Sequence, residues 1–190
     1  MILRKMAGYF VAGLLIAVTT GCATQAPTLD FVPKDVIATG KKIDFELKTI
    51  SVSIAKEDER QGETQVGLFG NQYESSFKQS FKDAIEEALS KSAIFNDLST
   101  RKLSLSAKVL RFESPSMGIN FDTQCTVRYQ LLDRSTGKLL FTRDVKSVGT
   151  VPFDYAFIGM IRLAEARNRA VRQNVEQLVQ SLSEFQDPGK

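Results

Sequence analysis

The stretch that decides the fold is residues 119–148, INFDTQCTVRYQLLDRSTGKLLFTRDVKSV. Apolar and polar residues alternate from Ile119 to Leu131, which predicts a strand with one buried and one wet face. The run from Asp133 to Lys138 is rich in turn residues, and Gly137 suits a positive φ, so a hairpin is expected there. A return strand from Leu139 to Val148 completes it. An antiparallel pair of strands joined by a hairpin turn is therefore predicted.

Two further strands are predicted upstream, and each contains a change of apolar parity. In Ile43 to Ile54 the apolar positions shift phase after Leu47, which indicates a bulge or two half-strands. In Lys102 to Glu113, Leu110 and Phe112 fall out of phase with the apolar residues before them. That strand is expected to be either bulged or apolar on both faces.

Helical spacing of apolar residues predicts two helices. The first runs from Asn71, as N-cap, to Lys91. The second runs from Asp154, as N-cap, to about Leu182, with Asn168 as the single polar member of its apolar seam. The order of strand, helix, three strands and helix predicts an α+β fold. We expect a four-stranded, mainly antiparallel sheet with both helices packed on one face.

The N-terminus, MILRKMAGYFVAGLLIAVTTGC, has the order of a secretory signal: basic, then apolar, then small residues before Cys22. Its apolar part is too short for the roughly 20 residues of a membrane-spanning helix. TTGC resembles the lipobox of bacterial lipoproteins. The resemblance implies cleavage before Cys22, acylation of that residue, and a place in the inner leaflet of the outer membrane. An ordinary secreted protein and a retained anchor are the alternatives.

The predicted organisation is a signal peptide (1–21), a lipidated N-terminus and tether (22–42), one periplasmic domain (43–182) and a tail (183–190). An apolar cluster around Phe31 and Val32 indicates that part of the tether docks on the domain. Cys22 and Cys125 are the two cysteines in the chain, so acylation of Cys22 would leave Cys125 as a buried structural thiol.

Composition limits the chemistry. The chain has no histidine, which removes the commonest general base and metal ligand. Removing Arg4 and Lys5 with the signal lowers the formal charge from +3 to +1, which gives no reason to expect nucleic acid. Phosphate-binding glycine loops, paired-cysteine metal motifs and nucleophile elbows are missing from the sequence. We therefore expect no enzyme, cofactor or metal site. The basic cluster at Arg162, Arg167, Arg169 and Arg172 is expected to supply exposed charge.

Three segments, AIEEALSKSAIF (84–95), VRYQLLDRSTGKLLFTRDV (127–145) and ARNRAVRQNVEQLVQSL (166–182), resemble small α/β lipoprotein domains of the Gram-negative envelope. The similar families are the auxiliary lipoproteins of ABC-type transport systems, the lipopolysaccharide-assembly lipoprotein, the TolB amino-terminal domain and the curli-secretion channel subunit. Ala93 stands where these families often have glycine.

The resemblance implies a non-catalytic accessory subunit that docks on an envelope transport or assembly machine. A regulator of a periplasmic cell-wall enzyme and a structural subunit of a secretion channel are alternatives, and the oligomeric state is left open. Exposed apolar residues often mark interaction sites, so partner contacts are expected at these positions: Leu110, Phe112, Phe153, Tyr155, Leu68 and Phe69.

Overall fold

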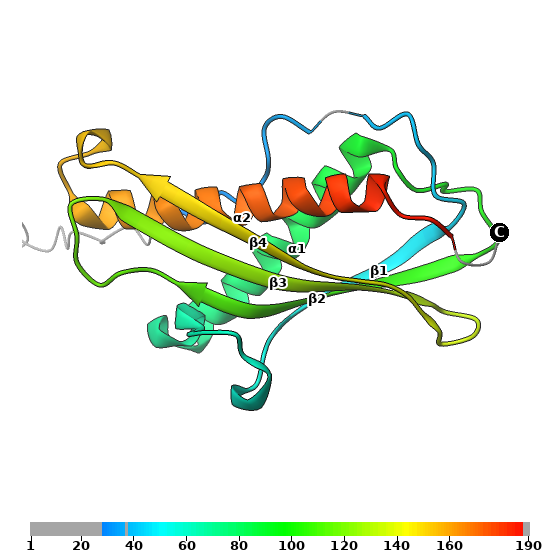
Figure 1. Ribbon diagram of the computed structural model, residues 1–190, viewed down its shortest axis with the longest axis horizontal. Coiled ribbons are helices and arrows are strands. Elements are labelled where there is room, and N and C mark those ends of the chain that lie inside the picture. The colour runs from blue at the N-terminus through cyan, green and yellow to red at the C-terminus, as the bar shows by residue number, and fades with distance from the viewer. Residues whose placement is uncertain (1–27, 37, 188–190) are drawn as a thin grey trace, which may run out of the picture.

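The computed structural model describes residues 28–36 and 38–187 and has the predicted α+β fold. Its strands form one sheet in sequence order, and both helices cover the same face of that sheet (Figure 1). The elements in chain order are β1 (Glu46–Ile54), α1 (Asn71–Ser92), β2 (Lys102–Glu113), β3 (Phe121–Asp133), β4 (Leu139–Val151) and α2 (Gly159–Ser183).

The pairing of the strands confirms the predicted hairpin. β3 runs antiparallel to both β2 and β4, and Val127 faces Val145 across the hairpin. Gly137 has a φ of 70° in the turn, and its N–H donates to the carbonyl of Asp133. β1 pairs with β2 in parallel, an arrangement that needs a crossover, and α1 supplies it.

Both changes of apolar parity correspond to breaks in strand register. The pairing of β1 with β2 shifts between Leu47 and Thr49, and the pairing of β2 with β3 shifts between Val109 and Arg111. Each break inserts one extra residue, Lys48 or Leu110, so the side chains after it change face relative to the simple alternation.

The N-terminal segment is part of the core. Phe31 is fully buried, and its ring lies edge-on to Phe77 and Phe81 of α1, with centroids 5.2 and 6.2 Å away. The backbone N–H of Asp30 donates to Asn168 on α2 at 3.2 Å. The predicted docking of this segment is confirmed. The contacts of the packed domain therefore extend back to Thr28, within the segment predicted as the tether.

The segment after α2 is also attached, against the prediction of a loose tail from residue 183. The ring of Phe185 packs against Phe141, with centroids 6.0 Å apart. Asp187 forms an ion pair with Arg101 at 2.5 Å. These contacts extend the packed domain to residue 187, the last that the structure describes before 188–190.

α2 lies close on β4 because Gly149 has no side chain. A Cβ built there would sit 2.0 Å from the carbonyl oxygen of Ala166 and 2.3 Å from the nitrogen of Ala170. A buried polar cluster lies next to this contact. The hydroxyl of Tyr129 donates to Oδ1 of Asn174 at 2.8 Å, and Nδ2 of Asn174 donates to the carbonyl of Val145 at 3.1 Å.

Both helices begin differently from the prediction. Gly70 occupies the N-cap position of α1, and its carbonyl accepts the N–H of Glu74, so Asn71 is the first helical residue. Asp154 lies in a separate 3-10 turn, Phe153–Tyr155, and α2 starts only at Gly159. Residues 152–158 therefore form a connection that leaves the sheet before the helix begins.

Candidate functional site

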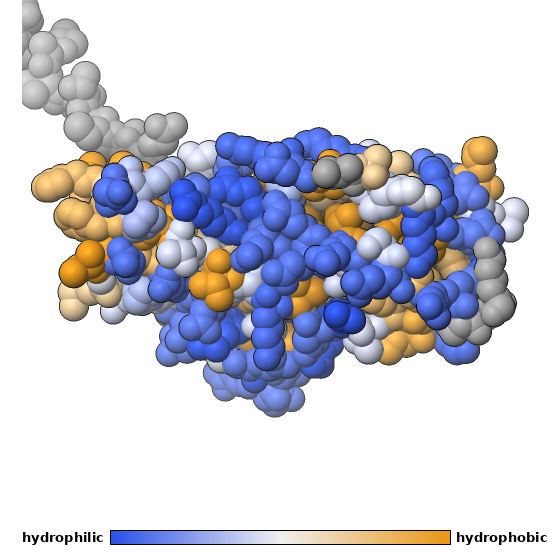
Figure 2. Space-filling model, turned by 45° about the horizontal axis from the view of Figure 1, so that its top comes forward, coloured by the Kyte–Doolittle hydropathy of each residue, from blue (hydrophilic) through white to orange (hydrophobic). Residues whose placement is uncertain are grey.

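Exposed apolar side chains gather at one end of the molecule. Of the twelve large ones that the described residues expose, eight belong to the loop between β2 and β3, the connection from β4 into α2, or the first turn of α2. Because Phe121 pairs with Val151, both segments leave the sheet at the same end. Figure 2 shows hydrophobic residues collected at the left end of the molecule. We call this surface the apolar tip: Met117, Ile119, Phe153, Tyr155, Phe157, Ile158, Met160 and Ile161.

Arg162, the fourth residue of α2, holds the tip in shape. Its guanidinium is buried, and its Nη1 donates to the carbonyls of Ala156 at 2.5 Å and Phe157 at 3.0 Å. The same group lies 4.8 Å from the ring centroid of Phe153 and 5.6 Å from that of Phe121. One cation thus links the connection, the helix and the start of β3.

Two further backbone carbonyls of the connection are also paired. The carbonyl of Pro152 accepts the N–H of Tyr155, and that of Ile158 accepts the N–H groups of Ile161 and Arg162. Four carbonyls beneath the exposed apolar side chains are therefore already satisfied, those of Pro152, Ala156, Phe157 and Ile158. Such a surface can be desolvated without leaving these carbonyls unpaired.

The predicted interaction residues fall into three groups. Phe153 and Tyr155 are half-exposed and lie in the apolar tip. Leu110 and Phe112 are buried, which corrects their expected role as an exposed patch. Their burial follows from the bulge, and from the segment after β1, whose Gln61 N–H donates to the carbonyl of Leu110.

The remaining predicted residues are less informative. Leu68 is exposed just before α1, in the 3-10 turn Gln65–Phe69, whereas its neighbour Val66 is fully buried. The side chain of Phe69 and the whole of Cys22 lie outside what the structure describes.

Sequence reasoning identified part of the tip, because the segment VPFDYAF (151–157) is a candidate partner surface. Helical spacing also assigns Phe157 and Ile161 to a seam that faces the sheet or a partner helix, yet Phe157 is 92% exposed. The available signal was PFDYAFIGMI, residues 152–161, an apolar run with one charge that extends past the end of the last strand.

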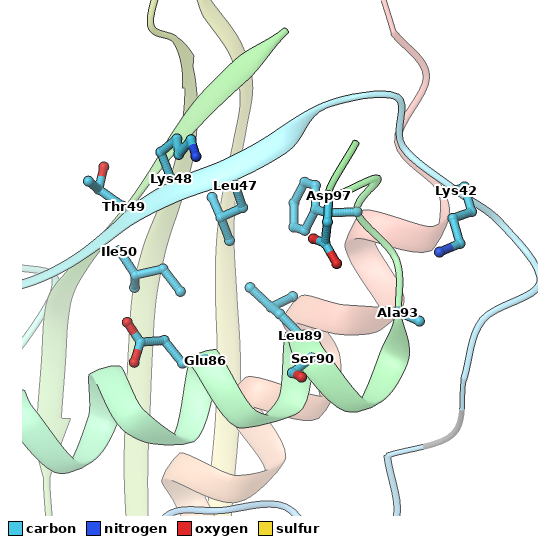
Figure 3. Close-up of a pocket in the computed structure, with 11 residues that line it drawn as sticks. Lys42, Leu47, Lys48, Thr49, Ile50, Glu86, Leu89, Ser90, Ala93 and Asp97 are labelled. Atoms are coloured by element: carbon cyan, nitrogen blue, oxygen red, sulfur yellow. The ribbon is translucent and has the colours of Figure 1, made fainter. Parts of the chain in front are cut away.

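A second surface feature is a groove of about 260 Å³ between the edge strand β1 and α1 (Figure 3). Its apolar floor is formed by Leu47, Ile50, Leu89 and Phe95, and the charged side chains of Lys48 and Glu86 stand at its rim. The bulge at Lys48 interrupts the backbone ladder here. Bulges and lysines are common means by which edge strands resist addition of another strand.

The four arginines do not form the expected exposed basic face. Arg162 and Arg167 are buried, and burial lowers the pKa of Arg167 while the nearby Tyr73 opposes that change. Arg172 pairs with Glu165 at 2.6 Å and with Asp30 at 2.9 Å. Arg172 therefore joins α2 to the N-terminal segment, whereas Arg169 binds the carbonyl of Thr150 in β4.

Cys125 is the buried thiol that the alternation predicted. Burial raises its pKa to about 12, which keeps the sulfur protonated and unreactive near neutral pH. Within residues 28–36 and 38–187, no group of three or more acidic, cysteine or histidine side chains is arranged to hold a metal ion. Across the same part of the chain, neither helix combines the length and the apolarity required to cross a bilayer.

No protein-family model matches the sequence, and no curated protein matches it significantly. Solved structures do resemble it. Protein XCC0632 from Xanthomonas campestris, of the family model DUF330, has a TM-score of 0.53 at 17% identity over 80% of this chain and 90% of that one.

Two other similar structures are a hypothetical protein, CT253, from Chlamydia trachomatis and a minor lipoprotein from Acinetobacter baumannii. The first has a TM-score of 0.47 at 12% identity over 74% of this chain and 97% of that one. The second has a TM-score of 0.44 at 13% identity over 75% of this chain and 93% of that one. At these identities the similarity to the Xanthomonas protein establishes a shared fold alone.

Proposed function

We propose that this protein is a lipid-anchored, non-catalytic accessory subunit of an envelope transport or assembly machine. Its lipid would sit in the inner leaflet of the outer membrane, with the domain in the periplasm. The lipobox resemblance at Cys22 supplies the anchor in this proposal. The fold shared with the Xanthomonas protein is compatible with it but assigns no activity.

The observation that carries the proposal is the short link between Cys22 and the packed domain. Thr28 is already attached, because its carbonyl accepts a hydrogen bond of 3.1 Å from Nδ2 of Asn168. Six residue steps separate Cys22 from Thr28, and at about 3.3–3.6 Å per residue they span at most about 22 Å. An acyl chain on Cys22 would thus hold the domain at the membrane surface, where it could serve a membrane-bound machine but could not reach far into the periplasm.

The groove beside β1 is the proposed contact for a protein partner. It is concave, has an apolar floor and charged rim, and runs along a strand edge (Figure 3). Since the bulge at Lys48 breaks the ladder, a partner would bind mainly through side chains that enter the groove, and less by extending the sheet.

The anchor is tested by labelling cells with radioactive palmitate. Wild-type protein should carry the label and fractionate with outer membranes, and Cys22→Ala should lose both properties. Cys125→Ala is the matched control, because it removes the other cysteine in the chain and should keep the label. Equal labelling of Cys22→Ala and wild type would refute the anchor.

The partner is tested by placing a photo-crosslinking amino acid at Lys48, in the groove, or at Lys138, in the exposed hairpin turn. We expect a defined protein adduct from Lys48 and none from Lys138, with mass spectrometry identifying a component of an envelope machine. Adducts at neither position, in cells where the protein is correctly anchored, would argue against a partner in the groove.

A further inference from the structure

We propose that the apolar tip inserts into the lipid leaflet that holds the anchor, so that the domain contacts the membrane at two points. This inference rests on the proposed lipidation of Cys22. It assigns a specific occupant, the acyl and headgroup boundary of a bilayer, to the exposed side chains of the tip.

Position is the first argument. Thr28 and Leu29, at the start of the described chain, line a small apolar pocket together with Met160 and Leu163 of α2. Met160 belongs to the tip, so the link to Cys22 leaves the domain beside it. A link of at most about 22 Å gives the tip a high local concentration at the leaflet.

The composition of the tip is the second argument. Its side chains are Phe, Tyr, Ile and Met, and a tyrosine at the margin of an apolar surface suits the level of lipid headgroups. Asp154 is the single charge in residues 152–161, and it is exposed. The carboxylate of Asp154 is compatible with insertion about 5–10 Å into the boundary between headgroups and acyl chains, but it prevents deeper insertion.

Backbone hydrogen bonding is the third argument. A loop can enter an apolar environment only if its polar groups are satisfied internally. The carbonyls of Ala156 and Phe157, beside the most exposed aromatic ring, both accept from Arg162. The arginine sits below them, buried and held by aromatic rings, so it can satisfy these acceptors while its charge stays at the base of the tip.

The absence of tryptophan from the chain allows a direct test. Phe157→Trp places one fluorescent probe in the tip. Leu98→Trp places one in the α1–β2 connection, outside the tip, and both native side chains are 92% exposed. Each full-length lipidated variant is incorporated into phosphatidylethanolamine and phosphatidylglycerol vesicles, with or without bromine on the acyl chains.

We expect bromine to reduce the emission of Phe157→Trp about twofold or more, because the probe lies within 5–10 Å of the acyl chains, and to leave Leu98→Trp unchanged. Equal responses from the two probes, in protein that floats with the vesicles, would overturn the insertion and leave the anchor intact. Protein that carries no lipid by mass spectrometry and does not float would refute the anchor and the inference together.

A second copy of the chain is the competing occupant of the tip. In that case the Phe157→Trp emission would shift to shorter wavelength on self-association, measured by sedimentation velocity, and would be insensitive to bromine. That result would overturn the membrane assignment in favour of an interface between copies.

Discussion

The backbone N–H of Asp30 donates to Oδ1 of Asn168, which joins residues 138 positions apart. Through Nδ2, the same amide binds the carbonyl of Thr28. A polar residue in the apolar seam of α2 thereby attaches the N-terminal segment, including the fully buried Phe31, to the domain.

Replacing Asn168 by alanine should cost about 1–3 kcal/mol of unfolding free energy, because two partly buried backbone groups lose their partners. Urea unfolding measures the loss, and trypsin should cleave faster after the neighbouring Lys34. Gln173→Ala, which removes an exposed amide from the same helix, is the control and should cost less than about 1 kcal/mol. Equal stability of the two variants would contradict the attachment.

Gly149→Ala should destabilise the protein by about 3 kcal/mol or more, since the new methyl group would overlap backbone atoms of Ala166 and Ala170. The loss should appear as a lower Tm in circular dichroism. Gly40→Ala is the matched control, because a Cβ at Gly40 has no atom within 4 Å, and its Tm should stay near wild type. A tolerated Gly149→Ala would show that α2 can move away from β4.

The contact between Tyr129 and Asn174 should be strongly coupled. Tyr129→Phe leaves Oδ1 of Asn174 without its donor. Asn174→Ala removes the acceptor of the Tyr129 hydroxyl and the amide donor to the Val145 carbonyl. A double-mutant cycle on unfolding free energy should give a coupling of about 1–2 kcal/mol. The pair Tyr129→Phe and Gln173→Ala should be additive, and additivity in the first cycle would refute the coupling.

Cys125 predicts a loss of stability at alkaline pH. The folded state keeps the thiol protonated up to about pH 12, whereas the ordinary pKa is 9.0, so above pH 9 the unfolded chain binds fewer protons. The free energy of unfolding therefore falls as the pH rises from about 9 to about 12. The contribution of the protonated thiol to stability is fully present below pH 9.

At pH 10 the free energy of unfolding should be about 1.4 kcal/mol lower for this reason, because one pH unit above the unfolded pKa is worth that amount. Cys125→Ala should lack it, so urea unfolding of that variant should vary less with pH between 8 and 10 than that of wild type. Parallel pH profiles for the two proteins would contradict the burial of the thiol.

The sheet was predictable because its information is local. Alternation defines β3, turn residues define the hairpin at Gly137, and each parity change marks a register break seen in the structure. The outcome of such a break was not local. Burial of Leu110 depends on its bulge and on the segment that contains Gln61. That segment lies between β1 and α1, far from Leu110 in the sequence.

The tip was predicted only in part, for a different reason. Helical spacing continues smoothly through Phe157 and Ile161, but it does not reveal where the sheet stops. β4 ends at Val151, so these side chains have passed the last strand that could cover them. Arg162 was likewise expected at the surface. The sequence does not show that two carbonyls and two aromatic rings contact its guanidinium in place of solvent water.

The hydrogen bond between Thr28 and Asn168 also cannot form until late in synthesis of the chain. The ribosome makes the first residue 140 positions before the second, a delay of roughly 7–28 s at about 5–20 residues per second. During that interval the aromatic stripe of α1 emerges while most of its cover, including three strands and α2, is still unmade. The N-terminal segment is thus the earliest part to be synthesised and among the last to be fixed.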